Sequence, residues 1–187
     1  MSSFIIEGGC RLKGHIRPQG AKNEALQVIC ATLLTAEEVT LHNVPDIRDV
    51  NGLIQLIEGM GVRVTNLGHG SWSFQADQVD LDHLETDIYR QRVSSLRGSV
   101  MVLGPMLARF GRGFIPQPGG DKIGRRRLDT HFQGLAALGA NFDYDQDQKS
   151  YSVKGGYLRG TYILLEEASV TGTANVVMAA VLAEGKT

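Results

Sequence analysis

Apolar residues recur at helical spacing in two stretches of the first third of the chain. In residues 20–34 (GAKNEALQVICATLL) they fall at i, i+3, i+4, i+7 and i+8, a set formed by Leu26, Ile29, Cys30, Leu33 and Leu34. Residues 46–61 repeat the pattern with Val50, Leu53, Ile54 and Ile57, and their last glycine is a typical helix stop. Both stretches are therefore predicted to be amphipathic helices.

Shorter apolar runs with alternating or β-branched residues predict strands. Residues 4–9 and 11–18, before the first helix, are predicted to form two short strands interrupted by glycines. Residues 39–45 predict a strand that Pro45 ends, and residues 62–67 and 71–76 predict a pair joined by a Gly-His-Gly turn. The order after the first helix is thus strand, helix, strand, strand.

The same order returns further along the chain. Residues 90–110 predict one long helix, whose apolar face consists of Val93, Leu96, Val100, Leu103 and Leu107. A strand and loop, a helix and a strand pair then follow at residues 112–120, 127–139, 141–145 and 150–155. A last strand and helix are expected within residues 162–185, where they begin a third round.

The repetition predicts the fold class. Residues 55–61 (QLIEGMG) overlay residues 133–139 (QGLAALG), which indicates a spacing of about 75 residues, larger than that of small solenoid repeats. We expect an α/β (α+β) domain built from a few large, similar β/α units, the third of them incomplete. Because the last helix then lacks the strands that should cover its apolar face, we expect the chain to be part of a longer polypeptide.

Charge and composition narrow the choice of partners. The 187 residues carry a net charge of -1, which does not favour nucleic acid or a membrane surface. The apolar runs are shorter than the roughly 18 residues that cross a bilayer. Cys10 and Cys30 lack metal-ligand spacing, and the N-terminus lacks a secretory signal. We therefore expect a cytoplasmic protein with reduced thiols, without a metal or other cofactor.

One short stretch concentrates positive charge around a carboxylate. Residues 118–131 (PGGDKIGRRRLDTH) place Asp121 after two glycines and before Lys122, Arg125, Arg126 and Arg127. Glycines let the backbone pass close to a ligand, and arginine side chains bind phosphate or carboxylate oxygens. The stretch favours an anion-binding loop with a candidate acid at its tip, and a solvated basic loop is the alternative. His131 is expected to be a helix residue, not a catalyst.

Three other stretches have a functional and a structural interpretation. Lys22 and Asn23 open a helix, where an anion can bind or where they simply form a solvated first turn. Arg97 interrupts an apolar helix face and indicates either a ligand clamp or a structural salt bridge. Residues 168–175 (ASVTGTAN) present hydroxyls and backbone N–H groups from Ser169, Thr171 and Gly172, which ordinary helix capping explains equally well.

Taken together, GAKNEAL, SSLRGS and PGGDKIGRRRLDTH resemble the UDP-N-acetylglucosamine 1-carboxyvinyltransferase family, and the similarity extends through ARFGRG and the closing AEGKT. These enolpyruvyl transferases open bacterial peptidoglycan synthesis. The resemblance implies a two-domain enzyme in which each domain is an inside-out α/β barrel of three similar units. Residues 1–20 would be strands of the other domain, residues 21–187 most of one truncated domain, and the missing second domain part of the same polypeptide.

The resemblance also implies roles for individual residues. Lys22 and Asn23 would contact phosphoenolpyruvate, and Arg97 would contact the sugar nucleotide. Asp121 stands where many members carry a cysteine, and it would protonate the methylene carbon of the enolpyruvyl group while being a poor target for the antibiotic fosfomycin. The uridine-diphosphate site would be lined by Arg126, Arg127, Leu128, Asp129, Thr130, Ser169 and Val170, and Arg126 would also face the enolpyruvyl phosphate.

Two other functions are compatible with the sequence. A 5-enolpyruvylshikimate-3-phosphate synthase shares the fold and reaction type implied by the resemblance but lacks the 118–131 loop in this form. A non-catalytic sugar-nucleotide-binding module is the second alternative, because one domain by itself lacks the groups expected from its partner. The chain alone is expected to be inactive.

Overall fold

The computed structural model describes residues 3–116 and 128–187. The first half of the chain contains, in order, α1 (Lys22–Ala31), the 3₁₀ helix η1 (Thr32–Leu34), β1 (Glu38–Leu41), α2 (Arg48–Gly59), β2 (Arg63–Gly68) and β3 (Ser71–Gln75). The second half contains η2 (Asp82–Glu85), α3 (Asp87–Ser95), η3 (Arg97–Val102), α4 (Leu103–Phe110), β4 (Arg112–Pro116), α5 (Asp129–Ala137), β5 (Ala140–Asp145), β6 (Ser150–Gly155) and α6 (Val170–Ala180).

The first unit runs from α1 to β3 and follows the predicted order. Helix α2 buries one apolar face, made of Val50, Leu53, Ile54, Leu56 and Ile57. Strand β3 lies between β1 and β2 and is antiparallel to both. The turn between β2 and β3 has positive φ at Gly68, His69 and Gly70, a conformation that glycine adopts without steric cost.

The second unit repeats this topology. Strand β6 lies between β4 and β5 and is antiparallel to both, so the sheet order β4-β6-β5 matches β1-β3-β2. Gly61 follows α2 with a φ of 93°, and Gly139 follows α5 with a φ of 105°. These two glycines occupy the same place in the overlaid sequences, so the predicted repeat is confirmed at the level of single residues.

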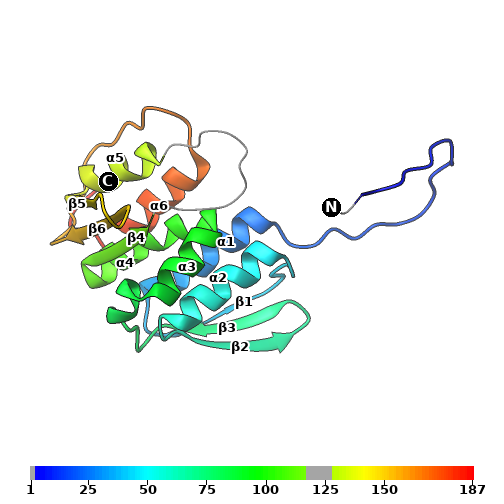
Figure 1. Ribbon diagram of the computed structural model, residues 1–187, viewed down its shortest axis with the longest axis horizontal. Helices are drawn as coiled ribbons and strands as arrows, with labels where there is room; N and C mark the ends of the chain where they lie inside the picture. Colours follow the sequence, from blue (N-terminus) through cyan, green and yellow to red (C-terminus); the bar gives the residue numbers. More distant parts are fainter. Residues whose placement is uncertain (1–2, 117–127) are drawn as a thin grey trace.

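The sheets lie outside and the helices inside (Figure 1). Helix α6, which opens the third unit, packs against α1, α4 and α5. Burial of Ile29, Leu33, Met106 and Ala179 shows that the core lies among these helices. The arrangement confirms the predicted inside-out α/β class. None of the helices in the described parts of the chain is long and apolar enough to cross a membrane.

The prediction of one long helix over residues 90–110 is wrong, because the segment is divided among α3, η3 and α4. Helix α3 ends at Ser95, Leu96 is extended (φ −130°, ψ 113°), and η3 and α4 follow. At the junction of η3 and α4, the Asn175 side chain donates from Nδ2 to Val100 O (3.0 Å) and accepts at Oδ1 from Gly104 N (2.7 Å). A continuous α-helix would join those two backbone groups directly. The apolar face itself is confirmed, since Val93, Leu96, Val100, Leu103 and Leu107 are all buried.

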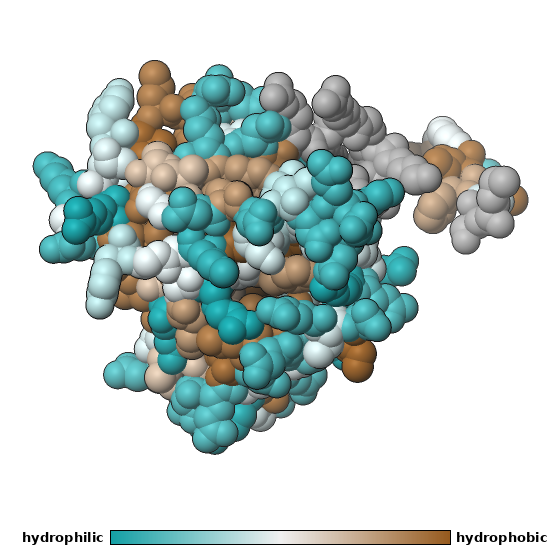
Figure 2. All heavy atoms as spheres, turned by 60° about the vertical axis from the view of Figure 1, so that its left-hand side comes forward, coloured by the Kyte–Doolittle hydropathy of each residue, from teal (hydrophilic) through white to brown (hydrophobic). Residues whose placement is uncertain are grey.

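The three strands predicted at residues 4–9, at residues 11–18 and at the start of residues 162–185 do not form in this chain. Residues 4–18 and 162–167 form no strand, and neither segment is paired with a strand among the described residues. A strand without such a neighbour leaves its backbone groups unpaired and is at best marginally stable. In Figure 2 the apolar side chains of the N-terminal segment lie away from the rest of the molecule, consistent with exposed fractions of at least 88% for Phe4, Ile5, Ile6, Leu12 and Ile16.

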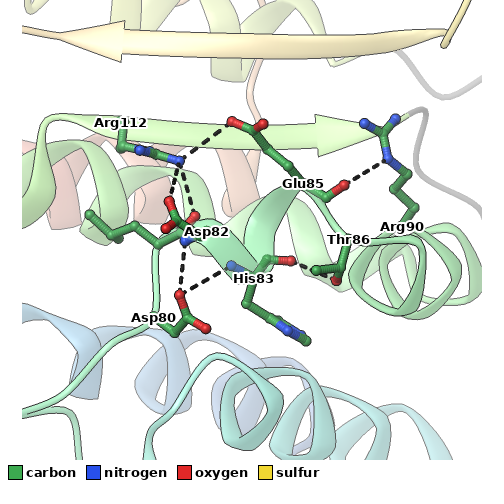
Figure 3. A network of polar contacts seen from close by, with 8 residues as sticks. Asp80, Asp82, His83, Glu85, Thr86, Arg90 and Arg112 are labelled. Carbon is green, nitrogen blue, oxygen red and sulfur yellow. Dashed lines mark hydrogen bonds and ion pairs between the residues drawn. The ribbon is translucent and has the colours of Figure 1, made fainter.

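A polar network fixes the connection between the two units (Figure 3). Arg112, at the start of β4, donates to Leu81 O (3.1 Å) and pairs with Glu85 (3.4 Å) and Asp82 (3.8 Å). Asp80 Oδ1 accepts from the backbone N–H of Asp82 (2.9 Å). These contacts hold η2 against β4, the first strand of the second sheet. The charged residues of this network therefore have a structural role.

Helices α1 and α6 share an apolar groove that no described residue covers. Its lining includes Val28, Ala31, Val170, Ala174 and Val177. Val170 is 75% exposed and Val177 is 56% exposed, unusually high values for apolar residues next to a core. The groove agrees with the expectation that the last helix has an apolar face without its usual covering.

Candidate functional site

The N-termini of α5 and α6 lie side by side and form the centre of the candidate site. The two helices are packed together, and Gly172 allows close contact, since an added Cβ there would lie 3.1 Å from Thr130 Cγ2. Helix N-termini offer unpaired backbone N–H groups and a partial positive charge. Two of them next to each other make this surface suitable for an anionic group.

The first-turn hydroxyls predicted for this surface have partners within the protein. Ser169 caps α6, and its Oγ accepts from Gly172 N (3.1 Å). Buried Thr130 donates from Oγ1 to Glu167 Oε1 (3.1 Å). The capping interpretation of Ser169 is therefore confirmed, and the Thr130 hydroxyl is engaged within the protein.

Arg97 brings a full positive charge to the same region. It is half-buried at the start of η3. Arg97 opens η3, which packs against α6 and α1, and its charge helps to lower the pKa of His131 in the first turn of α5. The break after α3 places Arg97 at the start of a short helix, whereas the sequence predicted it in the middle of a long one.

His131 is a buried helix residue, as predicted. Burial, and secondarily the positive charge of Arg97, lower its pKa from 6.5 to about 4. Its Nε2 lies 3.2 Å from Thr171 Oγ1, and its Nδ1 lies 3.1 Å from Asn175 Nδ2. The imidazole is thus neutral at pH 7 and connects α5 to α6.

Lys22 and Asn23 occupy the exposed first turn of α1. Lys22 Nζ donates to Asp49 Oδ2 at 2.8 Å, and both side chains are 44% exposed. The N-cap residue Ala21 provides no side-chain cap, so the first turn lacks the partner that a Ser, Thr, Asp or Asn at this position would supply. One turn later, Leu26 packs against Gly98, which follows Arg97. The start of α1 therefore belongs to the same side of the molecule as Arg97.

The remaining predicted site residues divide into two groups. Val170 and Asp129 are exposed in the first turns of α6 and α5, and Leu128 is half-buried at the N-cap position of α5. Asp121, Arg126 and Arg127 lie outside the described residues, as do Lys122 and Arg125. The structure thus brings together Arg97 and the two stretches 128–130 and 169–170 that the family resemblance had assigned to one ligand.

The sequence analysis missed Asn175 and the contacts of Thr171 and His131. The available signal was a single asparagine in the apolar run TANVVMAAV, since a polar residue on a buried helix face requires hydrogen-bond partners. Those partners come from η3, α4 and α5, so no local pattern could identify them.

Comparison with known proteins identifies the family. The family model described as EPSP synthase (3-phosphoshikimate 1-carboxyvinyltransferase) matches residues 6–187. The chain is 64% identical over 187 residues to UDP-N-acetylglucosamine 1-carboxyvinyltransferase of Bacteroides fragilis, and 56% identical to the protein of the same name from Porphyromonas gingivalis. In both cases all of the chain is matched, but it spans only 43% of the relative's length.

Solved structures agree on the fold. The enolpyruvyl transferase NikO from Streptomyces tendae superposes with a TM-score of 0.76 at 17% identity, covering 95% of this chain and 41% of that one. An EPSP synthase from Acinetobacter baumannii gives a TM-score of 0.68 at 18% identity, covering 92% and 39% of the two chains. From the match of the family model and the identity to these relatives, we conclude that the chain belongs to the EPSP synthase (3-phosphoshikimate 1-carboxyvinyltransferase) family.

Proposed function

We propose that the chain is the N-terminal part of an enzyme that transfers the enolpyruvyl group of phosphoenolpyruvate to the 3-hydroxyl of UDP-N-acetylglucosamine. The observation that carries this proposal is the 56–64% identity, over the whole chain, to relatives named UDP-N-acetylglucosamine 1-carboxyvinyltransferase. The reaction is the first committed step of peptidoglycan synthesis, and it serves cell-wall biogenesis and thereby cell shape and division. It takes place in the cytoplasm and uses no cofactor.

The positive groups of the candidate site suit two substrates that are both anionic. Arg97 and the N-termini of α5 and α6 present positive charge and N–H groups to the diphosphate of the sugar nucleotide. Lys22 and Asn23, at the open start of α1, bind phosphoenolpyruvate. Arg126 and Arg127 add further cations from the 118–131 stretch, and Arg126 also faces the enolpyruvyl phosphate.

The proposed reaction is an addition followed by an elimination. The oxygen of the sugar 3-hydroxyl forms a bond to C2 of phosphoenolpyruvate, its proton passes to a base of the other domain, and C3 gains a proton. In the second step C3 loses a proton, the C2–O bond to phosphate breaks, and the C2–C3 double bond returns. Catalysis requires cations for both substrates and an acid that protonates carbon.

Asp121 is the proposed acid. An ordinary aspartic acid is ionised at neutral pH, and neighbouring cations stabilise its charged form. The phosphate and carboxylate of bound phosphoenolpyruvate neutralise those cations, and closure of the site removes water from the carboxyl group. The acid therefore forms only when both substrates are bound.

The rest of the enzyme is the partner that the proposal requires. In the complete enzyme, residues 1–20 pair as strands of the other domain, although residues 3–20 form no strand in this chain, and residues 21–187 form most of one domain. The chain by itself has no turnover, because the base and the remaining substrate contacts belong to the part that it does not span. The apolar groove between α1 and α6 is covered by that remaining part.

The proposal is tested on a joined polypeptide, made of this chain and the part of the Bacteroides fragilis relative that it does not cover. Phosphate release from phosphoenolpyruvate should require UDP-N-acetylglucosamine and should be absent with this chain alone. Release with 3-phosphoshikimate instead would favour the other reaction named by the family model. Nucleotide-sugar binding without phosphate release would favour a non-catalytic module.

The Asp121→Asn variant tests the acid. It should lose at least about a thousandfold in turnover, since an amide cannot donate a proton to carbon, while the affinity for UDP-N-acetylglucosamine in calorimetry stays within about twofold. Asp147→Asn, at an exposed position in the turn between β5 and β6, is the matched control. Wild-type turnover in Asp121→Asn would rule out this role for Asp121.

A further inference from the structure

A chain of side-chain hydrogen bonds runs from the core to the surface of the candidate site. It begins at Asn175, which is fully buried in α6, passes through His131, which is 3% exposed, and ends at exposed Thr171. The two side-chain contacts in this chain measure 3.1 and 3.2 Å. The direction of each hydrogen bond follows from the groups at its buried end.

The orientation of the Asn175 amide is fixed by two backbone groups. Its oxygen faces the Gly104 N–H (2.7 Å), and its nitrogen faces Val100 O (3.0 Å). Rotating the amide by half a turn would place donor against donor and acceptor against acceptor. The second hydrogen of Asn175 Nδ2 is therefore directed to His131.

This orientation selects the tautomer of His131. Because Asn175 donates to Nδ1, that nitrogen carries a lone pair and no hydrogen, so the hydrogen of the neutral ring is on Nε2. Nε2–H then donates to Thr171 Oγ1. A protonated ring would place an N–H against the Asn175 amide, and the nearby positive charge of Arg97 also opposes protonation.

Thr171 is left as a hydrogen-bond donor at the surface. Its oxygen accepts from His131, and among residues 3–116 and 128–187 its hydroxyl has no second partner. Ser169, the other first-turn hydroxyl of α6, already caps the helix. The open hydroxyl hydrogen therefore belongs to Thr171, next to the paired N-termini of α5 and α6.

We propose that Thr171 donates its hydroxyl hydrogen to a phosphate oxygen of the sugar nucleotide, and that His131 and Asn175 are positioning residues that keep this hydroxyl a donor. The inference rests on the proposed function, which supplies the ligand. Among residues 3–116 and 128–187, the charged groups around this hydrogen-bond chain are Arg97 from η3, Asp129 from α5 and Glu167 before α6. A neutral histidine keeps the orientation of Thr171 constant at pH values where a surface histidine would change its charge.

The binding test uses the joined polypeptide and UDP-N-acetylglucosamine in calorimetry. Thr171→Val removes the donor while keeping the shape of the side chain, and it should weaken binding about tenfold, the effect of one hydrogen bond to a charged group. Thr171→Ser keeps the hydroxyl and should stay within about threefold of wild type. Thr65→Val, at an exposed position on β2 of the first unit, is the matched control and should not change binding.

The tautomer test uses this chain labelled with ¹⁵N-histidine and nitrogen chemical shifts at neutral pH. The signals of His131, recognised because they shift in Thr171→Val, should show a neutral ring protonated at Nε2. A ring protonated at Nδ1, or wild-type affinity in Thr171→Val, would overturn the inference while leaving the proposed function intact. Absence of binding by the unmodified joined polypeptide would overturn both.

Discussion

The two complete units share one topology but differ in what their corresponding helices, α2 and α5, bury. Helix α2 of the first unit buries only apolar side chains. Helix α5 of the second unit buries Thr130 and His131 in its first turn. A buried polar group lowers stability unless it is hydrogen-bonded. In the second unit, each of these two side chains has hydrogen-bond partners. The first unit thus mainly stabilises the fold, and the second places polar groups where the candidate site lies.

The largest expected effect on stability comes from the apolar side chains that α2 buries. Leu53 is fully buried in α2. Changing it to alanine should lower the free energy of unfolding by about 3 kcal/mol, because the lost contacts leave a cavity. Urea denaturation measures the loss. Leu135→Ala in α5 is the matched change in the second unit and should cost a similar amount, whereas Leu67→Ala, 53% exposed on β2, should cost less than about 0.5 kcal/mol. A loss below about 1 kcal/mol for Leu53→Ala would contradict the comparison.

The second largest expected effect concerns His131, a buried polar residue of the second unit. The pKa of His131 is lowered from 6.5 to about 4 in the folded state, whereas the unfolded chain keeps the ordinary value. Above pH 6.5 neither state binds the proton, but between pH 6.5 and 4 only the unfolded state does. Stability should therefore fall as the pH decreases through this window, by about 3 kcal/mol in total for this one residue.

Urea denaturation across that pH range measures the effect. In His131→Gln the contribution should disappear, so its stability should fall less steeply than that of the wild type. His15→Gln, in the exposed N-terminal segment, should leave the pH dependence unchanged. Equal slopes for wild type and His131→Gln would mean that His131 titrates normally in the folded protein.

The smallest expected effect concerns the surface pair of the first unit. Lys22 and Asp49 are both 44% exposed, and exposed ion pairs contribute less than about 1 kcal/mol. Asp49→Asn should therefore change the unfolding free energy by less than that amount, and the difference should vanish at high salt because of screening. A loss above about 2 kcal/mol that persists at high salt would show that Asp49 has a structural role like that of the buried network in the second unit.

The sequence predicted the features that depend on local periodicity. Helices α1 and α2 and both strand pairs form where apolar spacing and glycine stops placed them. The repeat was recognisable because equivalent backbone turns need glycine, as at Gly61 and Gly139. These features are set by residues close together in the chain, so a single sequence contains the information.

The errors arose where distant residues decide the local structure. Within residues 90–110, the junction of η3 and α4 forms where the Asn175 amide, supplied from α6, takes the Val100 and Gly104 backbone groups. The strands expected at residues 4–9, at residues 11–18 and at the start of residues 162–185 have no pairing partner among the described residues. For the site, residue types indicated anion binding, but the hydrogen bonds of His131 and Thr171 depend on how α5 and α6 pack.

The most direct test of the central claim is a crystal structure of the joined polypeptide with UDP-N-acetylglucosamine bound. The account predicts the diphosphate at the paired N-termini of α5 and α6, within hydrogen-bond distance of the Thr171 hydroxyl and near Arg97. A nucleotide sugar bound against the first unit, with no contact to these helix N-termini, would contradict it.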